Sequence, residues 1–294
     1  MKKQKTDKPS APTHLPRGEG TGGNAPIKHK GSHNTRIKQL FAAPFVVFLL
    51  IFVLLPLLLL IWNAFFGGGS FSFKSITDVF TDGQSMPVLW RSIWVAFIAT
   101  AVCIAIGYPI AYWLALTKFN RAGTILVLFI LPMWINAMLR IYALREVINI
   151  FTEDMNYGTL ILGLVMDYLP FMIMPIYVVL SNIDKKLLEA ASDLGAPPRQ
   201  VFMKTVLPLS VPGILSGFLI VFTPSVSTYF ISEYLGDSSK TLMFGELINK
   251  LMKNFEANIA KVSVLALILL AVLGLAILAT NRLSKIGNNR GGLW

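Results

Sequence analysis

The sequence predicts an all-α membrane protein with six transmembrane helices in one membrane domain. Hydrophobic residues make up 54% of the 294-residue chain and charged residues only 14%, whereas typical soluble domains carry about 25% charged residues. Several apolar runs also exceed the roughly 18 residues that a helix needs to cross the hydrocarbon core of a bilayer. A chain of this length then has no room for a large soluble domain beside the membrane domain.

Six apolar runs are long enough to be transmembrane helices. In chain order they are Phe41–Phe65, Ser92–Leu116, Thr124–Leu144, Gly158–Ser181, Val211–Ile231 and Val262–Ala279. Prolines interrupt these runs, among them Pro109, Pro132, Pro170, Pro175 and Pro224. They predict kinked helices, which can serve as the bistable elements of a gate.

The first 39 residues differ from the rest of the chain. They are rich in Lys, Pro, Gly, Ser, Thr and Asn, and cannot bury enough apolar surface to fold. We therefore predict a disordered basic tail over residues 1–39 and a transmembrane domain over residues 40–294. The nine Lys and Arg residues of the tail favour a position near anionic lipid, with a nucleic-acid-binding arm as the alternative. No cleavable signal peptide is expected, because the first apolar run is too long and begins too late.

The charge distribution orients the predicted helices. If the N-terminus is cytoplasmic, the inner segments carry 18 Lys and Arg residues and the outer segments carry eight. Lys and Arg are enriched in the cytoplasmic segments of membrane proteins. The distribution therefore favours a topology with both termini in the cytoplasm.

Signals for catalysis or for a bound metal or cofactor are absent from the sequence. The single cysteine, Cys103, lies inside the second run, which excludes a disulfide within the chain and a cysteine-based metal cluster. The histidines His14, His29 and His33 all lie in the tail. No phosphate-binding loop, zinc-protease motif or nucleophile elbow occurs. We expect no catalytic residues, metal or cofactor here. If the protein does work against a gradient, the energy must enter through a partner or an ion.

The segment 183–209, between the fourth and fifth runs, is patterned more strongly than an ordinary loop. Its first half places apolar residues on one helical face and charged residues largely on the other. Asp184 suits the first turn of this helix, and Gly195 supplies a left-handed stop after its end. Pro197-Pro198 then begins a second amphipathic helix. The pattern predicts two cytoplasmic helices at a fixed angle, shaped to fit another protein.

This segment resembles the EAA loop of bacterial ABC-importer permeases, whose pattern is E-A-A-x3-G-x9-I-x-L-P. The matching residues are Glu189, Ala190, Ala191, Gly195, Leu207 and Pro208, and the Ile position is occupied by Thr205. The resemblance implies the architecture of an ABC type I importer permease. It also implies that these residues insert into a cleft on a cytoplasmic ATPase subunit and couple ATP hydrolysis to opening of the membrane path.

Four further stretches resemble the spermidine/putrescine (PotB-type) permeases. They are Pro132-Met-Trp-Ile-Asn136, Arg140-Ile-Tyr-Ala-Leu144, Leu169-Pro-Phe-Met-Ile-Met-Pro175 and Pro212-Gly-Ile-Leu-Ser-Gly217. The resemblance covers Phe41–Ala279 and leaves out the basic tail. It implies a non-enzymatic subunit in the bacterial inner membrane. Its partners would be a second, similar permease, two cytoplasmic ATP-binding subunits and an extracytoplasmic polyamine-binding protein.

A polyamine cargo favours acidic and aromatic side chains along its path, through charge attraction and cation–π contacts. The candidates are Trp134, Asp167, Tyr229 and Glu233. Trp134 lies near the middle of the third run, where packing against a neighbouring helix is the alternative. Asp167 lies deep in the fourth run, where ionisable groups are functional or paired.

Tyr229 and Glu233 lie where the fifth run meets the outside, and a solvated helix end is the alternative for Glu233. Arg140 would repel a polycation. We therefore expect Arg140 off the pathway, reaching toward the interface or paired with an acid.

Two other functions stay open from the residues alone, a permease for another small solute and an ion-coupled secondary carrier. Secondary carriers often contain internal inverted repeats. No convincing repeat occurs in this sequence, and a secondary carrier would leave the pattern of segment 183–209 unexplained.

Overall fold

The computed structural model describes residues 44–67, 71, 73–116, 122–237 and 239–291, so the predicted basic tail lies outside the described residues. The chain divides into two units, Met1–Val53 and Leu54–Trp294. In the first unit, residues 44–53 are helical and pass into a π turn, η1 (Leu50–Leu54). The second unit holds all the remaining elements, and in its described part every element of regular structure is a helix.

The helices of the second unit follow one another with short connections. In chain order they are α2 (Leu55–Phe66), α3 (Lys74–Thr81), α4 (Ser85–Leu116), α5 (Ala122–Ile130), η2 (Leu131–Trp134), α6 (Ala137–Asn149), α7 (Tyr157–Ser181), α8 (Lys185–Asp193), α9 (Pro198–Val201), η3 (Phe202–Val206), α10 (Leu207–Ser227), α11 (Phe230–Leu235), α12 (Phe244–Met252) and α13 (Phe255–Gly291).

Three long helices, α4, α7 and α10, pack against one another and form the main core. Small residues allow their close approach, as is usual between membrane helices. A side chain at Gly217 of α10 would collide with Met172 of α7, and one at Gly213 would press against the backbone carbonyl of Pro175. The α7–α10 contact is therefore fixed by glycines on one helix facing bulky residues on the other.

A second core lies between α13, α2, α3, α12 and the first part of α4. Its largest fully buried side chain is Phe244, at the start of α12. The backbone N–H of Phe244 donates to the Ser92 hydroxyl at 2.7 Å, which ties α12 to the first part of α4. The α11–α12 region is thus packed onto the end of the membrane helices.

Five helices are long and apolar enough to cross a membrane, namely Pro44–Phe66, Ser85–Leu116, Tyr157–Ser181, Pro198–Ser227 and Ala257–Leu283. These correspond to five of the six predicted runs, with shifted ends. The fifth predicted run, Val211–Ile231, corresponds to the span Pro198–Ser227. This span ends at Ser227 because the chain is extended at Thr228.

The third predicted run, Thr124–Leu144, is not one straight helix. The arms Gly123–Trp134 and Ala137–Asn149 meet at an angle of 90°. Ile135 is extended, and the Asn136 side chain caps α6 by accepting a hydrogen bond from the N–H of Met138 at 2.8 Å. Pro132 lies in the first turn of the 3-10 helix η2, which precedes this bend. The described chain therefore has six spans only if this bent pair counts as one span.

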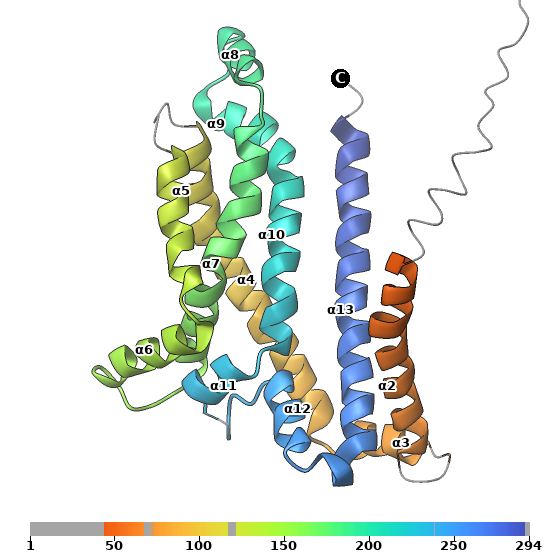
Figure 1. Ribbon diagram of the computed structural model, residues 1–294. Helices are drawn as coiled ribbons and strands as arrows, with labels where there is room; N and C mark the ends of the chain where they lie inside the picture. The colour runs from red at the N-terminus through yellow and green to blue at the C-terminus, as the bar shows by residue number, and fades with distance from the viewer. Residues whose placement is uncertain (1–43, 68–70, 72, 117–121, 238, 292–294) are drawn as a thin grey trace, which may run out of the picture. The chain divides into compact units, whose positions relative to one another are not determined.

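The short helices of the second unit are divided between the two ends of its bundle (Figure 1). The figure places α8 at one end, and α3, α6, α11 and α12 at the other. The segment with the EAA-like pattern and the candidate cargo residues Tyr229 and Glu233 consequently lie at opposite ends of the membrane helices.

Candidate functional site

Helix α8 has defined signals at both ends. The Asp184 side chain accepts a hydrogen bond from the N–H of Lys186 at 2.9 Å and caps the first turn. Gly195 has φ of +82°, which confirms the predicted left-handed stop. The N–H of Gly195 donates to the Ser192 carbonyl, and the N–H of Ala196 donates to the Ala191 carbonyl. This pair of bonds is a Schellman motif, which fixes the direction in which the chain leaves α8.

The second helix of the segment differs from the prediction, because it is continuous with a membrane helix. Pro197 precedes α9, which passes through the π turn η3 into α10. The π turn ends at Val206, two residues before Pro208, whose ring would clash with the carbonyl of residue 204 in an ordinary α-helix. A force applied to α9 therefore acts directly on the span Pro198–Ser227.

The predicted ATPase-coupling residues are largely accessible at this end of the bundle. Glu189, Ala190, Gly195 and Pro208 are exposed, whereas Ala191 and Leu207 are half-buried. The turn encloses a hollow of about 330 Å³, lined by Ala191, Leu194, Gly195, Ala196, Gln200, Val201, Lys204 and Thr205.

The apolar face of α8 is divided between the bundle and the surface. Ile183 and Leu188 pack against the main core. Leu194 is 89% exposed and Leu187 is 53% exposed. Exposed leucines beside a hollow provide apolar area for another protein to cover.

An aromatic cluster connects this segment to α4. The Phe202 ring meets Tyr112 at 5.3 Å and Tyr108 at 6.0 Å between centroids, edge to face in both cases. The Tyr108 hydroxyl lies 3.0 Å from the Ser210 hydroxyl of α10. Sequence reasoning predicted an amphipathic helix after Pro197-Pro198 but did not identify either tyrosine as its contact, because residues so far apart in the chain give no local signal.

At the opposite end, Tyr229 and Glu233 lie in the same short helical region as one member of a pair of tyrosine rings in contact. Tyr142 of α6 and Tyr234 of α11 have ring centroids 4.7 Å apart. The hydrogen bond with Tyr142 raises the pKa of Tyr234, and the nearby charge of Glu233 adds to this effect. Glu233 also lies 3.8 Å from the ammonium of Lys253, with its side chain 37% exposed. The structure thus brings Tyr229 and Glu233 together and adds Tyr142, Tyr234 and Lys253 to their surroundings.

Helix α11 is held in place by a buried carboxylate. Glu246 of α12 accepts a hydrogen bond from the Ser232 hydroxyl of α11 and forms an ion pair with Lys250 at 2.9 Å. Gly245 lies so close to the carbonyls of Ser227 and Thr228 that a Cβ there would be 2.1 and 2.6 Å from their oxygens. The start of α12 therefore lies directly against the end of α10.

The structure separates Trp134 and Asp167 from that group. Trp134 is at the end of η2 and is 85% exposed. Asp167 is in the middle of α7, with its side chain 5% exposed and its Oδ1 2.6 Å from Nη2 of Arg140. Of the two alternatives predicted for Arg140, the structure selects pairing with an acid.

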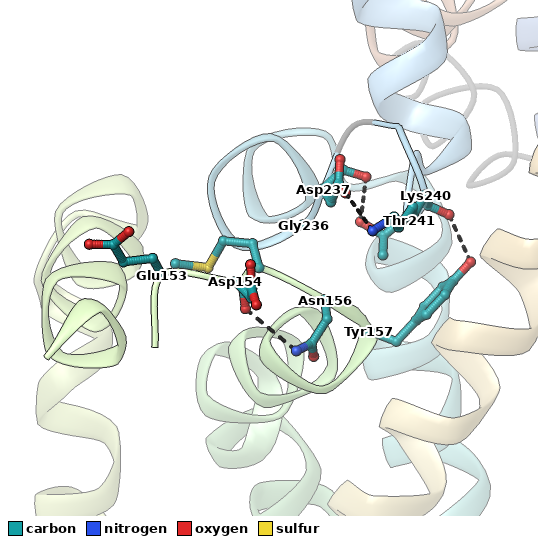
Figure 2. Close-up of a pocket in the computed structure, with 9 residues that line it drawn as sticks. Glu153, Asp154, Asn156, Tyr157, Gly236, Asp237, Lys240 and Thr241 are labelled. Carbon is teal, nitrogen blue, oxygen red and sulfur yellow. Dashed lines mark hydrogen bonds and ion pairs between the residues drawn. The ribbon is translucent and has the colours of Figure 1, made fainter. Parts of the chain in front are cut away.

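An acidic hollow also lies at the end opposite α8 (Figure 2). It has a volume of about 590 Å³ and is lined by Glu153, Asp154, Met155, Asn156, Tyr157, Gly236, Asp237, Lys240 and Thr241. The Tyr157 hydroxyl donates to the carbonyl of Lys240 at 2.8 Å and joins the two loops. Hydrogen bonds from the Ser239 side chain and backbone lower the pKa of Asp237. Sequence reasoning did not single out these loops, because neither one carries a motif.

These features define an all-helical, multi-pass membrane protein with distinct polar surfaces at the two ends of its bundle. A family model for the binding-protein-dependent transport system inner membrane component matches residues 32–285, and the chain belongs to this family. It is therefore a transport component of the bacterial inner membrane rather than an enzyme.

Relatives and solved structures agree with this assignment. The chain is 33% identical to the spermidine/putrescine transport system permease protein PotB of Escherichia coli K12, over 83% of this chain and 97% of that protein. It is 26% identical to the permease protein PotC of Haemophilus influenzae, over 68% of this chain and 79% of that protein. A chain of a bacterial alginate ABC transporter has the same fold, with a TM-score of 0.62. The two chains are 16% identical, and the match covers 86% of this chain and 95% of that one. That transporter was crystallised with an alginate pentasaccharide-bound periplasmic protein.

Proposed function

We propose that this chain is a permease subunit of an ATP-driven importer, and that its cargo is a polyamine of the spermidine/putrescine class. The observation that carries the cargo class is the 33% identity to a spermidine/putrescine permease over nearly the full length of that protein. The acidic and aromatic side chains opposite α8 support it, because they suit a cation.

The partners that we propose follow from the family and the relatives. The similarity to PotC shows that a second kind of permease resembles this chain, which suits a heterodimer. The alginate transporter, which shares the fold, was crystallised with a periplasmic protein, and this supports an extracytoplasmic binding protein. Two cytoplasmic ATP-binding subunits complete the assembly. In this topology both termini are cytoplasmic, and the bent pair α5–η2 and α6 completes an even number of crossings.

Segment 183–209 is the proposed contact with an ATP-binding subunit. Supporting this role are the exposed side chains of Leu187 and Leu194, the hollow beside Gly195, and the continuity of α9 with α10. Movement of an ATP-binding subunit against α8 would pull on α10 directly and reach α4 through Phe202.

For the cargo, we propose Tyr229 and Glu233 as contacts at the entrance of the path. Trp134, which is 85% exposed in this chain alone, suits a contact across the interface with the second permease. Asp167 is buried against Arg140, so its proposed contribution is indirect.

The experiment is uptake by proteoliposomes that contain this chain with its full set of subunits. Labelled spermidine and putrescine should accumulate only with ATP and the binding protein present. Accumulation driven by an ion gradient without ATP would indicate a secondary carrier. ATP-dependent accumulation of an uncharged solute, with no polyamine uptake, would contradict the cargo class and leave the importer intact.

A further inference from the structure

The ion pair between Arg140 and Asp167 is incompletely satisfied. Its side chains are 13% and 5% exposed, and the shortest distance between them is 2.6 Å. Within the described part of the chain, however, neither Nε of Arg140 nor Oδ1 of Asp167 has a well-aligned hydrogen-bond partner. A buried ion pair offsets its desolvation only when the geometry is excellent and the remaining donors and acceptors are satisfied. This pair is therefore poorly suited to adding stability, which points to a positional role.

The pair lies where α6 needs an attachment. Arg140 is in the first turn of α6, immediately after the 90° bend, and Asp167 is in the middle of α7. All of α6 is described, and its only buried residues are Ile141 and Ile148. Because so little of α6 is packed, its direction after the bend depends strongly on the cap at Asn136 and on this ion pair.

The direction of α6 in turn sets the surroundings of the entrance. Tyr142 follows Arg140 by two residues, and its ring contacts the ring of Tyr234 of α11, next to Glu233. A change in the angle between α6 and the preceding arm would therefore move Tyr142 away from α11. A cavity of about 250 Å³, lined by both members of the pair and by apolar residues of α5, η2 and α7, leaves room for such a movement.

We propose that Arg140 and Asp167 are positioning residues, which hold α6 against α7 so that Tyr142 meets α11 beside the cargo entrance. Neither residue contacts the cargo. The effect on transport rests on the proposed function, but the position of α6 can be measured without any cargo.

The test is crosslinking between α6 and α11 in the assembled complex. Tyr142→Cys and Tyr234→Cys are introduced together with Cys103→Ala, and the rate of bridging by a short bifunctional thiol reagent is measured in membranes. This background is combined with Arg140→Gln, Arg140→Lys, Asp167→Asn, or the exchange of Arg140→Asp with Asp167→Arg. Glu146→Gln, an exposed charge on the same helix, is the matched control.

Residues in direct contact couple strongly enough that we expect each neutral variant to lower the bridging rate by about threefold or more. The exchange variant and Arg140→Lys should recover most of that loss, and Glu146→Gln should leave the rate unchanged. In a chain that keeps Tyr142 and Tyr234, Arg140→Gln and Asp167→Asn should raise the polyamine concentration that gives half-maximal uptake. The exchange variant should restore that concentration toward the wild-type value.

Unchanged bridging in Arg140→Gln and Asp167→Asn would overturn the proposal. Absence of all four variants from the membrane would also overturn it, because the pair would then be needed for insertion or folding of the whole chain. A complex that imports a different solute would refute the proposed cargo, and the bridging result would still decide the role of the pair.

Discussion

Replacing Gly195 by valine tests the proposed coupling segment, residues 183–209, at the glycine that ends α8. Gly195 has φ of +82°, and a Cβ placed there would meet nothing within 4 Å. The substitution therefore causes no collision, and its whole effect comes from the backbone. A left-handed conformation costs an ordinary L-residue about 1–2 kcal/mol, and a β-branched residue is among the least suited to it.

The turn can respond to valine in two ways. It can keep its shape and carry the strain, or it can open and lose the hydrogen bonds from Gly195 to Ser192 and from Ala196 to Ala191. Each such bond contributes about 0.5–1.5 kcal/mol. Both routes thus cost a similar amount, and a cost of about 1–2 kcal/mol lowers the population of the native turn by roughly 5- to 30-fold relative to its competitors. Helix α8 would then point away from the direction set by α9.

The assay is ATP-dependent uptake in proteoliposomes, together with ATP hydrolysis stimulated by the loaded binding protein. Gly195→Val should insert normally and lose most uptake, by about fivefold or more. Gly195→Asn should retain uptake, because asparagine tolerates the left-handed conformation.

The matched control is Gly83→Val in the turn before α4. Gly83 has φ of +64° and equally open surroundings, but it lies far from α8. The backbone cost there is comparable, so a purely general loss of stability would affect both variants equally. Normal uptake by Gly195→Val, or an equal loss in Gly83→Val, would refute the coupling role.

Three further changes probe the other end of the bundle. Glu233→Gln removes a charge beside Tyr229 and should slow polyamine uptake by at least about fivefold if a charged hydrogen bond is lost; an effect under about twofold that vanishes with moderate salt would mark Glu233 as a solvated helix end. Burial of Asp82 opposes its ionisation, but hydrogen bonds from Lys261 and Ser85 outweigh burial and lower its pKa. A lowered folded-state pKa means that the stabilisation is complete above the unfolded-state pKa of about 4 and is lost as pH falls below it. Thermal unfolding of the wild type should therefore lose more stability below about pH 4 than that of Asp82→Asn, and parallel pH curves would contradict this. Gly245→Ala should lower the unfolding temperature, because its methyl group would press on backbone carbonyls of α10 that cannot move aside; an unchanged unfolding temperature would show that α12 can shift.

Features encoded by neighbouring residues could be predicted from the sequence. Hydropathy located the long spans, and the left-handed Gly195 followed from a helical pattern that stops at a glycine before two prolines. The bend in the third run was missed because hydropathy averages over a window and carries no information about direction. Asn136 gave a usable signal, since a capping residue within an apolar run can begin a new helix.

Contacts between distant segments could not be predicted in the same way. The sequence indicated that Arg140 would be paired or would reach the interface, but only the fold identifies Asp167 as its partner. The edge-to-face contacts of Phe202 with Tyr108 and Tyr112 likewise depend on how α4 packs beside the π turn. Both contacts join segments that are distant in the chain, so they form only once the bundle is assembled.

The two ends of the bundle are linked through helices that cross it without a break. Span Pro198–Ser227 begins in the coupling segment and ends at Thr228, where the chain turns extended just before Tyr229 and α11. A displacement of α9 along this helix would act on the contact between the end of α10 and Gly245 of α12, which is too close to be compressed. The α11–α12 region would then have to move with α10 or separate from it. Either response changes the surroundings of Glu233, and this gives a physical route from the proposed ATP-driven movement at α8 to the polar surface at the opposite end.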